Sequence, residues 1–90
     1  DEAPAAKEAA PAPKKPALSA LRKRVAEAEA KMERFHTLIA RVDEMLSHPE
    51  AFVKEPAKAA QLAAQRGELE KALAAAEEEW LAASAEMEGT

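Results

Sequence analysis

The stretch SHPEAFVKEPAKAAQL, residues 47–62, interrupts a chain that otherwise reads as helix. Pro49 and Pro56 lie seven residues apart, and Phe52 stands between them. A proline lacks the backbone donor that a helix interior needs, and it pushes the preceding residue out of helical geometry. The stretch therefore predicts that one long helix ends near Ser47. A second helix is expected to begin at Pro56, because proline suits the first helical position.

The residues before the interruption carry apolar side chains in heptads. Two positions of the repeat are filled over four heptads, which is typical of a coiled-coil seam. Ser19 is a plausible N-cap, so the pattern predicts a first helix over about residues 19–47. The two rows of the seam are Leu18, Val25, Met32, Ile39 and Leu46, and Leu21, Ala28, Phe35 and Val42.

The residues after the interruption carry a matching pattern and predict a second helix over about residues 56–88. Folding this helix back across a turn at 48–55 places Trp80 opposite Ala28, so that a large side chain meets a small one. We therefore expect an all-α domain over residues 18–90, a two-helix antiparallel coiled-coil hairpin. The rows of its second helix are Leu62, Leu69, Ala76 and Ala83, and Ala59, Arg66, Leu73, Trp80 and Met87.

The same register predicts contacts beside the seam. The stem of Arg66 is expected to lie along Val42, with its guanidinium in water. Glu29 falls near Glu77, a juxtaposition of like charges that the pattern does not explain. Three pairs of opposite charge are expected, each weak because it is exposed: Arg24 with Glu86, Lys31 with Glu79, and His36 with Glu70.

Phe52 is expected to be a plug for the closed end of the seam. Residues 49–53, PEAFV, are predicted to form a single helical turn. Such a turn would fold the ring of Phe52 over Leu46 and Leu62, the last residues of the two rows.

Residues 1–17 are expected to be a flexible, disordered linker. They hold four of the six prolines and no large apolar side chain, so they cannot bury enough surface to offset the entropy of ordering. Because the chain opens in such a linker, we expect it to be a piece of a larger protein. We also expect no secretory signal and no membrane span, since no apolar run is long enough. The absence of cysteine fits a cytoplasmic protein.

Sequence motifs of catalysis are weak, and we expect this chain not to be an enzyme. The two glycines stand alone and form no phosphate loop. His36 and His48 are twelve residues apart with no cysteine, so no metal site is expected. The acidic run 77–79 is interpreted as a solvated face. Trp80 is interpreted as part of the seam rather than as a platform for stacking a nucleobase.

Basic residues gather where the linker enters the first helix, and two more follow on one outward side of that helix. Such a strip can follow the phosphates of a nucleic acid. The alternative is a solvated face, because the chain carries a net charge of −4. The candidate nucleic-acid-binding residues are Lys14, Lys15, Arg22, Lys23, Arg24, Arg34 and Arg41.

Four short motifs resemble the C-terminal domain of bacterial ABC-F ATPases of the Uup-like branch. They are a Pro-x-x-Phe turn at 49–52, a Lys-Glu-Pro-x-Lys helix start at 54–58, Leu-Glu at 69–70, and Glu-x-x-Trp-Leu at 77–81. The resemblance also covers the lysine- and proline-rich linker ahead of the first helix. His48, Ala83 and Ser84 depart from the residues that are usual in that family.

The resemblance implies a parent ATPase with two ATP-binding cassettes, which would hold ATP and magnesium outside this chain. It also implies a cytoplasmic protein, with the hairpin as a DNA- or ribosomal-RNA-binding accessory domain. We expect weak binding, a monomer, and no cofactor in this chain. One alternative is a protein–protein or spacer hairpin without nucleic-acid contact. A third hypothesis is dimerisation through an outer alanine face made of Ala60, Ala64, Ala74, Ala75 and Ala82.

Overall fold

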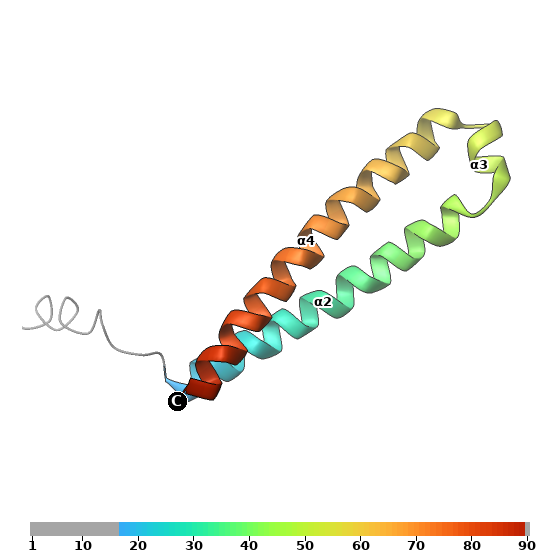
Figure 1. Cartoon of the computed structure of the whole chain (residues 1–90). Coiled ribbons are helices and arrows are strands. Elements are labelled where there is room, and N and C mark those ends of the chain that lie inside the picture. Colours follow the sequence, from blue (N-terminus) through green and yellow to red (C-terminus); the bar gives the residue numbers. More distant parts are fainter. Residues whose placement is uncertain (1–16, 90) are drawn as a thin grey trace, which may run out of the picture.

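The protein is an antiparallel helical hairpin in the computed structural model, which describes residues 17–89. The chain forms α2 over Leu18–Leu46, a short α3 over Pro49–Val53 and α4 over Pro56–Gly89. α2 and α4 lie side by side, and α3 lies at the end where the chain reverses (Figure 1). We call that end the hairpin tip and the opposite one the open end. The all-α hairpin predicted from the sequence is confirmed, whereas the expected linker, apart from Ala17, lies outside the described residues.

The ends of the helices follow the prolines, with small differences from the predicted bounds. His48 has an extended backbone, with φ −92° and ψ 119°, as expected of a residue before proline. Ser47 closes α2, and its hydroxyl donates to the carbonyl of Glu44 at 2.7 Å. At the other end Ala17 occupies the N-cap without a side-chain hydrogen bond, so the prediction of Ser19 as N-cap is wrong. The helix begins one residue earlier because Leu21 N–H already donates to the carbonyl of Ala17 at 3.0 Å.

The core is a narrow seam between α2 and α4, and it coincides with the predicted heptad rows. Among the residues whose burial is described, the six buried side chains all occupy seam positions, and four of the six are alanines. Alanine is buried this completely because a larger side chain of the facing helix can cover it. Most larger seam residues other than Leu21 and Val42 stay partly exposed, because only two helices surround them. The buried residues are Leu21, Ala28 and Val42 of α2, and Ala59, Ala76 and Ala83 of α4.

Polar contacts between the helices agree with the predicted register. Near the open end Arg24 lies 3.6 Å from Glu86, which confirms the pair expected there. In the middle Trp80 Nε1 donates to Glu29 Oε2 at 2.9 Å, at the level where Trp80 was predicted to face Ala28. The sequence pattern did not explain why Glu29 falls near Glu77. In the structure the carboxylate of Glu29 accepts a hydrogen bond from the indole of Trp80.

Candidate nucleic-acid interface

Five of the seven candidate basic residues lie on α2, and the other two, Lys14 and Lys15, fall outside the described residues. Three of the five share one outward side of the helix: Arg34 and Arg41 follow Lys23 by 11 and 18 residues, close to three and five whole turns. We call Lys23, Arg34 and Arg41 the outer basic stripe. At 1.5 Å per residue the stripe runs for about 27 Å along the helix.

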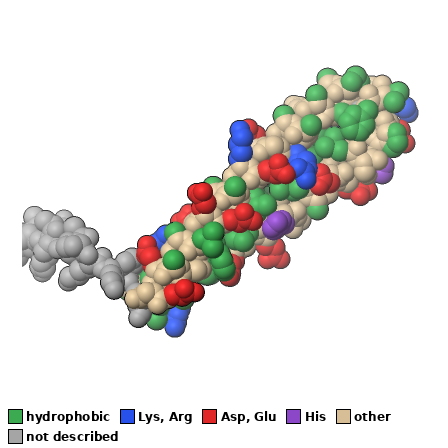
Figure 2. Space-filling model, in the orientation of Figure 1, with side chains coloured by type: hydrophobic (Ala, Val, Ile, Leu, Met, Phe, Trp, Pro, Cys, Tyr) green, Lys and Arg blue, Asp and Glu red, His purple; other side chains and the backbone are tan. Residues whose placement is uncertain are grey.

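The outer basic stripe is available to a partner. Lys23, Arg34 and Arg41 are all exposed, and none makes an ion pair with another described residue. Figure 2 shows one face of the hairpin, on which a few separate basic side chains lie among more numerous acidic ones. This face carries no large basic patch.

Arg22 and Arg24 stand apart from the outer basic stripe. Arg22 lies one residue before Lys23 and so about 100° around the helix from it, on another side of α2. Arg24 is directed to α4, where it lies 3.6 Å from Glu86 and 3.9 Å from Glu79. Its guanidinium is already matched by two carboxylates. The expected pair between Lys31 and Glu79 is wrong, because Glu79 pairs with Arg24 instead.

Arg66 forms a cluster of opposite charges across the seam. Its guanidinium donates to both carboxylate oxygens of Asp43, at 2.5 and 3.2 Å, and to Glu70 at 2.6 Å. The hydrogen bond from Arg66 holds the pKa of Asp43 below its usual value. The same contacts, first with Asp43 and then with Glu70, raise the pKa of Arg66. The guanidinium therefore links α4 to α2 through Asp43.

One expectation near this cluster is wrong: the predicted pair of His36 with Glu70 does not form, because Glu70 binds Arg66. The head of Arg66 was expected to reach water, and it lies at the exposed edge of the seam, where it also binds two exposed carboxylates. Sequence reasoning missed Asp43. The signal for it was present, since Asp43 flanks Val42, the seam residue predicted to face Arg66.

Phe52 does not plug the seam. Its side chain is 54% exposed and that of Val53 is 79% exposed, so both present apolar surface at the hairpin tip. Near the same end Ala59, in the first turns of α4, is only 3% exposed. The short helix α3 is present as expected, but Phe52 on it stays largely exposed.

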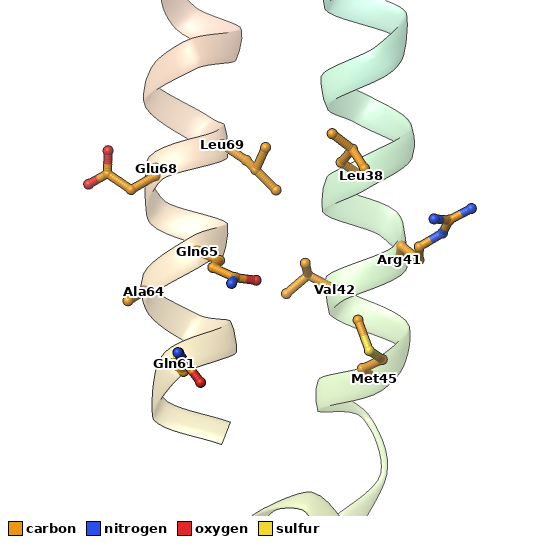
Figure 3. A pocket seen from close by; sticks show the side chains of 9 residues that line it. All are labelled: Leu38, Arg41, Val42, Met45, Gln61, Ala64, Gln65, Glu68 and Leu69. Carbon is orange, nitrogen blue, oxygen red and sulfur yellow. The ribbon is translucent and has the colours of Figure 1, made fainter. Parts of the chain in front are cut away.

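An open apolar groove lies between the helices near the tip, and we call it the tip groove. It has a volume of about 680 Å³. In Figure 3, Val42 and Leu69 point across the gap and Gln65 extends toward α2, whereas Arg41 and Glu68 point away on opposite outer sides. The lining residues are Leu38, Arg41, Val42 and Met45 of α2, and Gln61, Ala64, Gln65, Glu68 and Leu69 of α4.

The described residues offer no group of three or more His, Cys, Asp or Glu side chains placed to hold a metal ion. Nε2 of His48 lies 3.3 Å from Oε2 of Glu44, which is four residues earlier in the chain. Within residues 17–89, no helix combines the length and the apolar character that crossing a bilayer requires.

Residues 18–85, which include both long helices almost entirely, match the family described as the ABC transporter C-terminal domain. No curated protein and no solved structure matches the chain.

Proposed function

Because this chain belongs to the ABC transporter C-terminal domain family, we propose that it is a nucleic-acid-binding accessory arm of a soluble, cytoplasmic ABC-F ATPase. The parent protein would bind ATP and magnesium in cassettes outside this chain. The arm contributes no catalytic group and no cofactor. Its ligand is DNA or ribosomal RNA, and it binds as a monomer.

The outer basic stripe is the observation that carries the proposal. Three exposed cations with no ion-pair partner among the described residues line one side of α2 over about 27 Å. An unpaired cation can release a counterion from the phosphate chain without first giving up a carboxylate. Arg24 does not meet this condition, because Glu79 and Glu86 already neutralise it.

The distribution of acidic residues sets the direction of docking. The run Glu77, Glu78 and Glu79 lies on α4, and all three side chains are exposed. These carboxylates repel a phosphate chain, so the nucleic acid approaches α2 from its outward side. Lys14 and Lys15 precede α2 in the sequence and add two positive charges to the segment ahead of that helix.

A titration of the 90-residue chain with duplex DNA, branched DNA and RNA at two salt concentrations tests the proposal. Three to five phosphate contacts predict a slope of log K against log salt of about −3 to −4.5 on duplex DNA. Affinity is expected in the micromolar range or weaker at physiological salt. Removal of residues 1–17 should weaken binding further.

A matched pair of charge reversals separates the stripe from the overall charge. The double variant Lys23→Glu and Arg34→Glu should weaken binding and reduce the salt slope by about 2. The control, Lys58→Glu and Lys71→Glu, changes the net charge equally on α4, where both lysines already pair with glutamates. It should retain most of the affinity. Both proteins should keep the helicity of the wild type.

The second candidate function is a spacer or protein–protein hairpin without nucleic-acid contact. The mixture of signs on the face in Figure 2 and the net charge of −4 favour it. It takes first place if the intact chain shows no binding at low salt, or if the two double variants bind alike.

A further inference from the structure

The centre of the tip groove is apolar and open to solvent. Val42 is 6% exposed at its floor, and Met45 is 41% exposed at its edge. Leu38 and Leu69 complete the apolar wall from the two helices. With a volume of about 680 Å³ the groove lies within the size range of sites that take small organic groups.

The two rims of the groove differ in charge. On the α2 side the rim carries Arg41, a member of the outer basic stripe, and on the α4 side it carries Glu68 (Figure 3). A phosphate chain is attracted to the first rim and repelled by the second. A nucleic acid on the stripe therefore passes beside the groove, with its phosphates on the α2 side.

Two amide side chains reach the groove from α4. Gln61 and Gln65 are exposed, and neither side-chain amide makes a hydrogen bond with another described residue. Each amide offers both donors and an acceptor. An apolar wall with free amides beside it matches a nucleobase, which has apolar faces and a hydrogen-bonding edge.

We propose that the tip groove holds an unpaired nucleobase of the nucleic acid that the outer basic stripe binds. This inference rests on the proposed function, because the stripe must first hold the phosphate chain. A paired base cannot enter, since its faces are stacked and its edge is engaged; an unpaired base enters at the smallest unstacking cost. The arm is therefore selective for nucleic acid with an unpaired base.

The test compares two fluorescein-labelled DNA duplexes that differ by one bulged adenine. Anisotropy titrations of the 90-residue chain at low salt should show about fivefold or greater preference for the bulged duplex, which corresponds to about 1 kcal/mol. A 2-aminopurine at the bulge should change its emission on binding. The same substitution at a paired position should not.

Groove variants and a matched control locate the effect. Met45→Ala, and Met45→Ala with Gln65→Ala, should bring the preference to within about twofold of parity while the affinity for the paired duplex is retained. Leu81→Ala also truncates an exposed apolar side chain, at 60% exposure and away from the groove, and it should keep the preference.

The outcomes distinguish the two proposals. Equal binding of both duplexes overturns the groove assignment and leaves the proposed function intact. A preference that survives in both groove variants also overturns the groove assignment. No binding of either duplex at low salt overturns the proposed function, and with it the inference that rests on it.

Discussion

The side of the hairpin that carries Arg24 is bridged by ion pairs near the open end, whereas near the tip the same side has a groove. Near the open end Arg24 reaches across to Glu79 and Glu86. Near the tip the corresponding positions of α2 hold Leu38 and Met45, which cannot form such ion pairs. Together with Gln65 and Ala64 of α4 they line the tip groove. A continuous heptad seam therefore does not produce a uniform surface, because the residues beside the seam decide whether the space between two helices is covered.

The two halves also differ in how their cores are made. In the open-end half Leu21 and Ala83 are both 0% exposed. In the tip half the seam includes Arg66, whose charge is met by Asp43 and Glu70 instead of apolar contact. The tip half therefore places a charged cluster at a seam position, whereas Leu21 and Ala83 make the seam of the open-end half apolar.

Among the substitutions that test this comparison, Leu21→Ala should reduce the free energy of unfolding most. Truncation of a fully buried leucine removes apolar contact and leaves a cavity, so the free energy of unfolding should fall by about 3 kcal/mol. Met45→Ala in the tip groove should cost less than about 1 kcal/mol, because its side chain is 41% exposed. Urea denaturation followed by circular dichroism measures both. Equal losses would show that the two halves are packed alike.

The Asp43–Arg66 contact should make the tip half sensitive to acid. Because the Arg66 hydrogen bond lowers the pKa of Asp43 in the folded protein, the contact stabilises the fold above the unfolded pKa of about 3.8. This stabilisation is lost as the pH falls through the lower, folded pKa. Wild type should therefore exceed Asp43→Asn in thermal stability at neutral pH, and the difference should disappear in strong acid.

The control for the acid prediction is Glu33→Gln, which neutralises an exposed carboxylate of α2 that has no ion pair among the described residues. Its thermal stability should follow the wild type across the same range of pH. A constant difference between wild type and Asp43→Asn at every pH would contradict the role given to the carboxylate.

Phe52→Ala should have the smallest effect. The ring is 54% exposed on α3, so the free energy of unfolding should change by no more than about 0.5 kcal/mol. Thermal melting of the variant beside wild type is sufficient as a measurement. A loss of about 3 kcal/mol would instead identify the ring as a buried plug.

The sequence by itself determined the helices, their direction and their register. Pro49 and Pro56 placed the reversal, since the geometry of proline is local and needs no tertiary contact. The heptad rows placed the buried side chains, because a period close to the helical repeat puts them on one side wherever the helix lies. The exposure of Lys23, Arg34 and Arg41 follows from the same period.

Only the tertiary structure decided which polar partner each flanking residue takes. The sequence spacing allows Glu79 to pair with either Arg24 or Lys31. It also allows Glu70 to pair with either His36 or Arg66. Exposed ion pairs differ too little in energy for sequence spacing to rank them, so the positions of the side chains decide. The exposure of Phe52 and the tip groove have the same origin. Both depend on how closely α2, α3 and α4 approach near the tip, a distance that a one-dimensional pattern does not contain.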